Sequence, residues 1–294
     1  MGRYSALLLF FLGILWTIPG SAQIRLFVSV IPLKHFAERV GGSHVVVESL
    51  VQPGHSPATY EPSTRQMAAL ASANAFVRVG VPFETVWLER IRSTHPDLTI
   101  IDARDGVDLM PAGDHLPASE SPEGKSKVHD HNGSDPHIWL DPAIAKKISE
   151  NLRDYLMRTD PRNAGIYEDN TERFAAELTE LDLKVRALVE QGENRQFLVF
   201  HPAWGYFARA YGLEQLTVEH EGKAPGPRSL ARLIELGERE GIRTVFVQPQ
   251  FNARTAETLA VEMGADVAVL DPLAEDYAGN LLYAARAISG ISRP

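Results

Sequence analysis

Three side chains that can bind a divalent metal ion stand at places in the sequence where ligand sites commonly form. His201 directly follows a β-branched and aromatic run at Gln196–Phe200, and Asp271 directly follows a similar run at Val267–Leu270. Ligand sites in open α/β sheets lie at the carboxyl ends of the strands. His137 stands in a proline-bounded segment after a loop-like stretch. Two imidazoles and one carboxylate, with no thiolate, suit zinc better than copper(I) or calcium.

The elements that would position these side chains form a repeating pattern. Short β-branched runs alternate with helical patterns, which predicts βα units and parallel sheets. Four predicted strands fall in each half of the chain, so two α/β lobes fit better than one sheet. The predicted strands are Arg25–Ile31, His44–Val51, Ala75–Val79, Leu98–Ile101, Gln196–Phe200, Gln215–Val218, Thr244–Gln248 and Val267–Leu270.

A long amphipathic helix is predicted at Asn163–Gln191, between the two sets of strands. At 1.5 Å per residue such a helix is about 40 Å long, enough to brace two lobes, although a helix within a single domain is the alternative. We therefore expect an N-terminal lobe at 23–160, a linking helix at 161–192 and a C-terminal lobe at 193–294. Apolar side chains recur on one helical face at Tyr167, Phe174, Leu178, Leu181, Val185 and Leu188.

The first 22 residues have the layout of a secretory signal peptide. Arg3 precedes an apolar run at Leu7–Ile18, and small residues follow at Gly20–Ala22. The run is shorter than the roughly 20 residues that a spanning helix needs, which argues against the alternative of a membrane anchor. The chain has no cysteine, so neither a disulfide nor a cysteine-linked lipid is expected. We expect an exported protein that resides in a periplasm.

The charge of the chain argues against two classes of partner. The formal net charge is −9, which disfavours nucleic acid and anionic membrane surfaces and favours a cation. The stretch 110–132 is rich in Pro, Ser, Gly, Glu and Lys and has no apolar period, so it is predicted to be a long mobile loop. This loop carries His115, His129 and His131.

Several blocks of the sequence occur in an order and at spacings that match one known family. They are Val28–Leu33, Pro53-Gly54, Tyr60–Pro62, Asp135–Pro142, Phe200–Phe207, Glu221–Lys223 and Leu270–Leu273. Through them the chain resembles the metal-specific solute-binding proteins of ABC transporters, in the zinc-uptake branch, over nearly the whole mature chain. The resemblance implies an α/β fold of two Rossmann-like lobes, each with a four-stranded parallel sheet, joined by one rigid helix. It also implies one metal ion held in the cleft between the lobes.

The resemblance implies that His137, His201 and Asp271 are three of four metal ligands. Family members with a glutamate at the position of His201 tend towards manganese, so the histidine here indicates zinc. Histidines in the loop before the second ligand are also typical of the zinc proteins. The loop histidines named above would then capture zinc weakly, unless they are incidental residues of a solvated loop.

The fourth ligand position departs from the family pattern. That pattern is Pro-Gly-x-x-Pro-His-x-Tyr-Glu-Pro, and this chain has Ala58 where the ligand histidine is expected. His55 stands three residues earlier, and a turn through Ser56-Pro57 could bring it close. We expect His55 to complete a His3Asp site. A three-ligand site with water in the fourth position is the rival, and His220 is a less favoured substitute.

Ligating imidazoles usually donate their second N–H to a carboxylate or carbonyl. Three acidic residues near the expected ligands in sequence are candidates for this role, namely Glu61, Asp135 and Glu221.

These observations favour a monomeric periplasmic protein that captures Zn²⁺ and delivers it to an ABC permease in the inner membrane. A zinc hydrolase with an open coordination position is an alternative, but no His-Glu-x-x-His or Gly-x-Ser-x-Gly motif is present, and no catalytic residue is expected. A manganese-binding transporter component and an adhesin or metal-blind scaffold are further alternatives.

Overall fold

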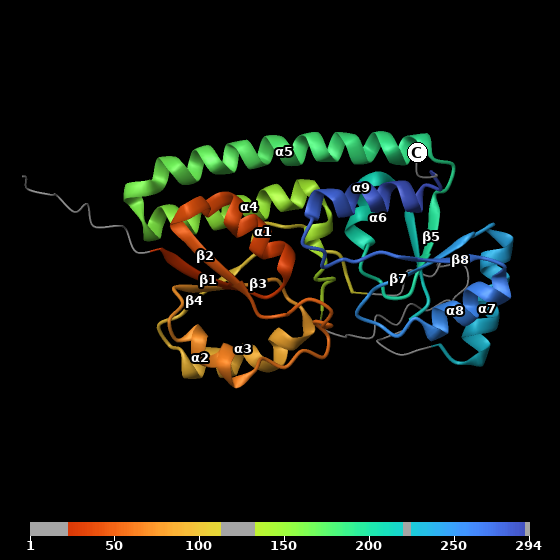
Figure 1. The fold of residues 1–294 in the computed structure, drawn as a ribbon, viewed down its shortest axis with the longest axis horizontal. Helices are drawn as coiled ribbons and strands as arrows, with labels where there is room; N and C mark the ends of the chain where they lie inside the picture. Colours follow the sequence, from red (N-terminus) through yellow and green to blue (C-terminus); the bar gives the residue numbers. More distant parts are fainter. Residues whose placement is uncertain (1–22, 113–132, 220–224, 292–294) are drawn as a thin grey trace, which may run out of the picture.

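The structure, a computed structural model, describes residues 23–112, 133–219 and 225–291. Two α/β lobes lie side by side beneath one long helix (Figure 1). Residues 1–22, most of the predicted loop with His115, His129 and His131, and the segment with His220 and Glu221 lie outside the described residues. In the part that is described, no helix is both long and apolar enough to cross a membrane.

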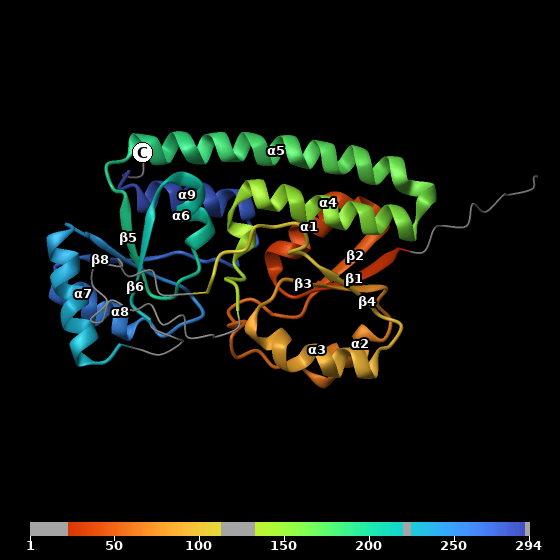
Figure 2. The same ribbon diagram turned by 180° about the vertical axis from the view of Figure 1, so that it is seen from behind.

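The N-terminal lobe is built on a four-stranded parallel sheet in the order β2-β1-β3-β4. The central strand β1 carries Leu26, Phe27 and Val28, all buried, as expected for a parallel strand covered on both faces. Helices α1 and α4 cover the face towards the long helix, and α2 and α3 cover the other (Figures 1 and 2). The elements are β1 (Ile24–Val28), α1 (Ile31–Gly41), β2 (Val45–Ser49), α2 (Thr64–Leu70), β3 (Ala75–Arg78), α3 (Pro82–Thr94), β4 (Thr99–Asp102) and α4 (Pro142–Thr159).

The C-terminal lobe repeats this plan with a parallel sheet in the order β6-β5-β7-β8. Helices α6 and α9 lie between this sheet and the long helix, and α7 and α8 cover the opposite face (Figures 1 and 2). The elements are β5 (Gln196–Val199), α6 (Gly205–Tyr211), β6 (Glu214–Thr217), α7 (Pro227–Arg239), β7 (Thr244–Val247), α8 (Arg254–Met263), β8 (Asp266–Val269) and α9 (Tyr277–Ile288). The two parallel four-stranded sheets predicted from the sequence are thus confirmed.

The long helix α5 runs over Ala164–Gln191 and confirms the predicted helix to within a residue at its start. Its 28 residues correspond to about 42 Å. It packs against α4 and α1 in the N-terminal lobe and against α9 in the C-terminal lobe. One apolar face is buried along its whole length, at Tyr167, Phe174, Leu178, Leu181, Val185 and Val189.

Aromatic side chains join the lobes where α1, α5 and α9 meet. Tyr277 of α9 lies edge-on to Phe36 of α1, with ring centroids 4.9 Å apart, and stacks on His35 at 5.9 Å. Phe174 of α5 lies 5.9 Å from Phe36. One cluster of buried apolar residues therefore continues from the N-terminal lobe into the C-terminal lobe.

The position of His35 makes the stability of this junction depend on pH. Burial, and then the charge of Arg39, lower the pKa of His35 below its ordinary value of 6.5, while Glu177 and Asp276 act in the opposite direction. Below about pH 6.5 the unfolded chain therefore binds more protons than the folded protein does. The stability that neutral His35 contributes is fully present above pH 6.5 and is lost as the pH falls below that value. We expect the melting temperature of the metal-free protein to fall between pH 7.5 and pH 5, and to fall less in His35→Gln. His55→Gln, at an exposed histidine, is the control; equal pH dependence of both variants would contradict the prediction.

Candidate metal centre

Two imidazole rings meet at the junction of the lobes. The ring centroids of His137 and His201 are 5.4 Å apart, and the ring planes are inclined at 74°. Two imidazoles bound to one tetrahedral zinc ion have centroids about 5 Å apart, because each Zn–N bond is about 2.0–2.1 Å long. The centroid spacing of the pair thus matches that of two imidazoles on one zinc ion. His201 follows β5 as predicted, but His137 follows no strand and instead precedes a 3-10 turn at Ile138–Leu140.

A carboxylate holds each ring from behind. Asp135 places Oδ1 2.7 Å from Nδ1 of His137 and also accepts the backbone N–H of that residue at 2.9 Å. Glu219 places both carboxylate oxygens 3.3 Å from Nδ1 of His201. These neighbours favour the tautomer in which Nδ1 carries the proton, which leaves the lone pair of Nε2 for a metal ion.

Backbone and ring contacts fix His201 further. The side chain of Gln248 accepts from the backbone N–H of His201 at 3.1 Å and donates to its carbonyl at 2.8 Å. Phe251 stacks on the imidazole with centroids 4.9 Å apart. Both partners come from the region where β7 ends, so neighbouring strand ends of one sheet position this ring.

Asp271 is held by groups around it at the end of β8. Its Oδ1 accepts from Nε2 of Gln250 at 2.8 Å and from the backbone N–H of Leu273 at 2.9 Å. Asn280 of α9 donates to its backbone carbonyl at 2.7 Å. Because both bonds from described residues to the carboxylate use Oδ1, Oδ2 is the oxygen that would be left for an ion.

A cavity of about 170 Å³ lies beside the two histidines and draws its walls from both lobes. Ala58 and Pro82 line it from the N-terminal lobe, and His201 and Phe251 line it from the C-terminal lobe. Pockets for drug-sized molecules typically measure about 300–1,000 Å³. The volume therefore suits an ion with a few waters better than an organic solute.

A larger hollow of about 490 Å³ lies at the other end of the C-terminal sheet, beside the starts of β5 and β7. Its wall includes Glu193, Arg195, Glu214 and Arg243, and it contains none of the predicted metal ligands. Two of the predicted ligands, His137 and His201, line the smaller cavity.

The structure brings together two of the four predicted ligands. Across residues 23–112, 133–219 and 225–291, no three His, Cys, Asp or Glu side chains are close enough to hold one ion. Asp271 is not among the residues that line the cavity, although Gln250 and Pro272 beside it are. His55 is exposed, with Nδ1 3.2 Å from the carbonyl of Pro53. The complete ligand set stays a prediction.

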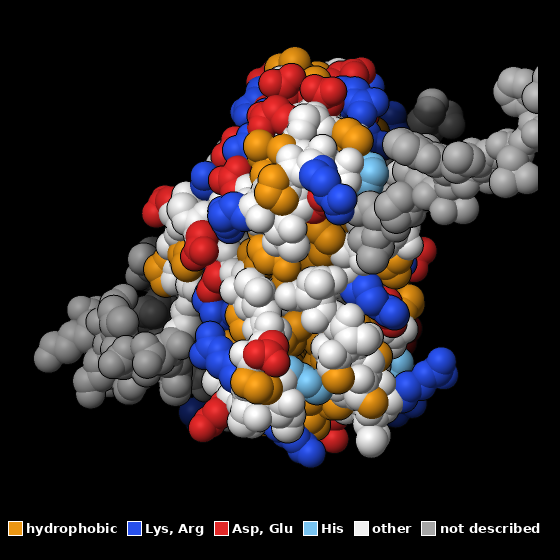
Figure 3. All heavy atoms as spheres, turned by 90° about the vertical axis from the view of Figure 1, so that its left-hand side faces the viewer, with side chains coloured by type: hydrophobic (Ala, Val, Ile, Leu, Met, Phe, Trp, Pro, Cys, Tyr) orange, Lys and Arg blue, Asp and Glu red, His pale blue; other side chains and the backbone are white. Residues whose placement is uncertain are grey.

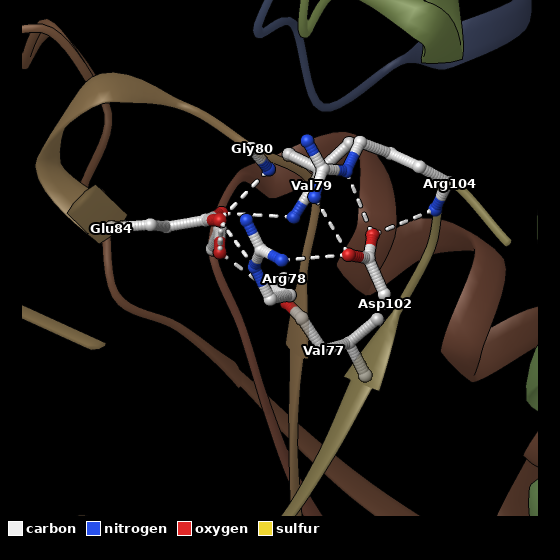
Figure 4. A network of polar contacts seen from close by, with 8 residues as sticks. Val77, Arg78, Val79, Gly80, Glu84, Asp102 and Arg104 are labelled. Atoms are coloured by element: carbon white, nitrogen blue, oxygen red, sulfur yellow. Dashed lines mark hydrogen bonds and ion pairs between the residues drawn. The ribbon is translucent and has the colours of Figure 1, made fainter. Parts of the chain in front are cut away.

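A buried carboxylate organises the cavity wall in the N-terminal lobe (Figure 4). Glu84 is 1% exposed and accepts the backbone N–H groups of Val79 and Gly80, each at 2.8 Å. It also accepts from Nε of Arg78 at 3.1 Å, and Arg78 in turn bonds Asp102 at 2.7 Å. The network fixes the backbone immediately before Val81 and Pro82, which line the cavity.

In the outer part of this network, Arg104 affects both the charge of Asp102 and the residue that can stand at Gly80. Burial alone would raise the pKa of Asp102, but hydrogen bonds from Arg104 and the charge of Arg78 bring it below its ordinary value. Gly80 has φ +91°, and a Cβ there would stand 2.6 Å from the guanidinium of Arg104. A glycine is therefore required for the turn that carries Val81 and Pro82 to the cavity.

Beyond the cavity, the outer face of the N-terminal lobe carries acidic and basic side chains interspersed with apolar ones (Figure 3). Such a mixture differs from the basic stripe that nucleic-acid binding requires.

Comparison with known proteins decides the family. The family model described as "ZnuA: Zinc-uptake complex component A periplasmic" matches residues 26–290. The chain belongs to this family. The zinc-binding protein AdcA of Streptococcus pyogenes is 28% identical over 267 residues, which cover 86% of this chain and 51% of AdcA. The chain thus spans about half the length of AdcA.

Two further relatives match over more of their own length. The high-affinity zinc uptake system protein ZnuA of Bacillus subtilis is 27% identical over 264 residues, or 85% of this chain and 79% of that protein. A crystal structure of a ZnuA deletion mutant with zinc bound superposes with a TM-score of 0.82 at 35% identity, covering 92% of this chain and all of the other. These matches agree with the two-lobed fold of the zinc-uptake family.

The departure from the zinc-uptake family pattern has a clear place in the structure. Ala58, at the position of the missing histidine, lines the cavity together with Ser56 and Pro57. His55 does not line it, and its ring lies edge-on to Tyr60 with centroids 5.8 Å apart. A ligand at the family position would therefore stand on the wall of the same cavity as the two histidines, whereas His55 must leave its present contacts to reach it.

Sequence reasoning identified one of the two orienting carboxylates. Asp135 contacts His137 as suggested, whereas Glu61 is exposed and the segment with Glu221 is not described. Glu219, 6% exposed, was missed in this role. Its place two residues beyond β6, at the same sheet end as His201, is the signal that could have identified it.

Proposed function

We propose that this protein binds Zn²⁺ between its two lobes in a periplasm and delivers it to an ABC permease of the inner membrane. The observation that carries the proposal is the pair of imidazoles, 5.4 Å apart, each with a carboxylate at Nδ1 and both at the cavity wall. This arrangement is typical of zinc-binding histidines. The zinc named in the descriptions of the family and of the relatives supports the same cargo.

The proposed ligands are His137, His201, Asp271 and His55. Asp271 joins the two imidazoles through Oδ2, while its bonds from Gln250 and Leu273 keep Oδ1 in place. His55 joins by giving up its 3.2 Å bond to the Pro53 carbonyl. An exposed hydrogen bond of this kind is worth only about 0.5–1.5 kcal/mol, so a zinc ion can outweigh it.

The loop that carries His55 offers a paired test of the fourth ligand. We expect His55→Ala to weaken zinc binding about tenfold or more, because a coordinate bond is lost. We expect Ala58→His to strengthen binding, since the new imidazole stands on the cavity wall. In the Ala58→His background, His55→Ala should then have little effect. Competition titration with a chelator of known affinity gives each dissociation constant, and unchanged affinity in His55→Ala alone would leave water as the fourth ligand.

Isothermal titration of the metal-free protein with zinc and manganese tests the proposal as a whole. We expect tight binding of zinc at the cavity and weaker binding of manganese, because two imidazoles suit zinc better. A hydrolase would need an open coordination position and a positioned base, so we also expect no ester or peptide hydrolysis by the zinc-loaded protein. Failure to bind zinc would overturn the transport role.

A further inference from the structure

We infer that Trp139 and Tyr277 are positioning residues that tie the His137 segment to the C-terminal lobe and thereby set the spacing of the histidine pair. The inference rests on the proposed zinc site and adds to it a device that governs how fast zinc dissociates. By chain order, His137 belongs to the stretch that leads into α4 of the N-terminal lobe, whereas His201 and Asp271 belong to the C-terminal sheet. Something must therefore hold the two parts in register.

Three buried hydrogen bonds cross between these parts. Nε1 of Trp139 donates to the carbonyl of Pro272 at 2.7 Å. The hydroxyl of Tyr277 donates to the carbonyl of Trp139 at 2.8 Å. The hydroxyl of Tyr206 donates to the carbonyl of Asp135 at 3.1 Å. Buried hydrogen bonds between groups this far apart in sequence fix position, because each lost bond leaves a desolvated polar group without a partner.

The bonds begin and end beside the proposed ligands. Trp139 is two residues from His137, and their ring centroids are 5.3 Å apart. Its acceptor, Pro272, directly follows Asp271, whose own carbonyl is held by Asn280 of α9. A single indole, fully buried, therefore joins the backbone next to one imidazole ligand to the backbone next to the carboxylate ligand.

The opposite cavity wall is held differently. The hydrogen bonds of Gln52–Tyr60 within the described residues go to the N-terminal lobe, such as that from the Phe83 backbone N–H to the Pro57 carbonyl at 3.2 Å. The histidine pair and Asp271 thus form one connected unit, and this loop forms another. Zinc entry and exit through movement of the loop would leave the histidine pair intact.

Trp139→Phe tests the indole bond while keeping an aromatic ring in the core. We expect the zinc dissociation rate, followed by stopped-flow transfer to a fluorescent chelator, to rise about tenfold, the lower end of the 10- to 100-fold loss of metal affinity that follows when a direct partner of a ligand is lost. The absorption spectrum of the cobalt(II)-loaded protein should also change, because it reports the geometry of the ligands.

Trp204→Phe is a matched control. Trp204 is also fully buried and lies three residues from His201, but its Nε1 has no hydrogen-bond partner within the part of the chain that the structure describes. Trp204→Phe removes the same side-chain volume as Trp139→Phe but removes no hydrogen bond of the indole. Its zinc dissociation rate and cobalt spectrum should therefore stay close to those of the wild type, even where its melting temperature falls. Equal dissociation rates in the two variants would overturn the inference.

Tyr277→Phe provides a second test that removes only one oxygen atom. Its control is Tyr167→Phe, which removes a hydroxyl that bonds Asp160 at 3.1 Å at the start of α5. Faster zinc dissociation in Tyr277→Phe but not in Tyr167→Phe supports the inference, even if Trp139→Phe fails to fold. Equal zinc dissociation rates in these two tyrosine variants count against the inference. If His201→Ala binds zinc as wild type does, the proposed site itself is wrong, which is a distinct result.

Discussion

Replacing His201 with alanine is expected to weaken zinc binding more than about 100-fold while the metal-free protein stays folded. Loss of a group that merely orients a ligand costs about 10- to 100-fold in metal affinity, so loss of the ligand itself should cost more. The side chain of His201 is 22% exposed, and its replacement removes the ring contacts with Phe251 and His137 and the bond to Glu219, none of which belongs to the apolar core. Chelator competition gives the dissociation constant, and the melting temperature without metal reports the fold.

Glu219→Gln separates ligation from orientation at the same ring. The side-chain oxygen of a glutamine can still accept a hydrogen bond from Nδ1–H of His201, but the amide carries no charge. We therefore expect a smaller loss of zinc affinity, about tenfold. The control is His95→Ala. His95 directly follows α3 and does not line the cavity, so this variant should bind zinc as the wild type does. If His201→Ala and His95→Ala had equal affinities, His201 would not be a ligand.

Replacing Glu84 with alanine is expected to destabilise the N-terminal lobe by about 3–5 kcal/mol, the usual effect of breaking a buried ion pair by removing one partner. The change leaves the N–H groups of Val79 and Gly80 without their acceptor and leaves Arg78 with Asp102 alone. Urea unfolding followed by circular dichroism gives the free energy of unfolding.

The same helix supplies the control for this prediction. Glu89 of α3 is exposed, so Glu89→Ala should change the free energy of unfolding by less than about 0.5 kcal/mol. Glu84→Gln, which keeps an acceptor oxygen, should fall between the two. A loss of less than 1 kcal/mol in Glu84→Ala would show that the network is not structurally important.

Much of the fold can be predicted from the sequence because its signals are local. The runs around Phe27 and Val245 are apolar on both faces, which only a covered parallel strand requires. Apolar residues recur on one face of α5, and this pattern likewise predicted a helix that packs along its whole length. Strand ends were predicted less well: β1 ends at Val28, three residues before the expected limit at Ile31, which is the first residue of α1, and β8 begins at Asp266, one residue before its expected start. Pairing with neighbouring strands sets those limits.

The candidate site was less predictable because it depends on side-chain directions across long separations. His201 could be placed by its strand end, but no local pattern shows that its ring meets His137, 64 residues away. The bond between Trp139 and Pro272 joins residues 133 apart. The place of His55, outside the cavity lining, depends on a turn whose side-chain contacts the sequence does not specify.

The place of α9 has a consequence for how the protein is made. A chain emerges from the ribosome with its N-terminus first, and domains fold as units in that order. The helix Tyr277–Ile288 follows all eight strands of the described residues, yet it packs against α5 and supplies the hydroxyl that holds Trp139. Both sheets can therefore form before the lobes are fastened together. The proposed ligand Asp271 and the hydroxyl of Tyr277 are thus the last parts of the proposed zinc site to be synthesised.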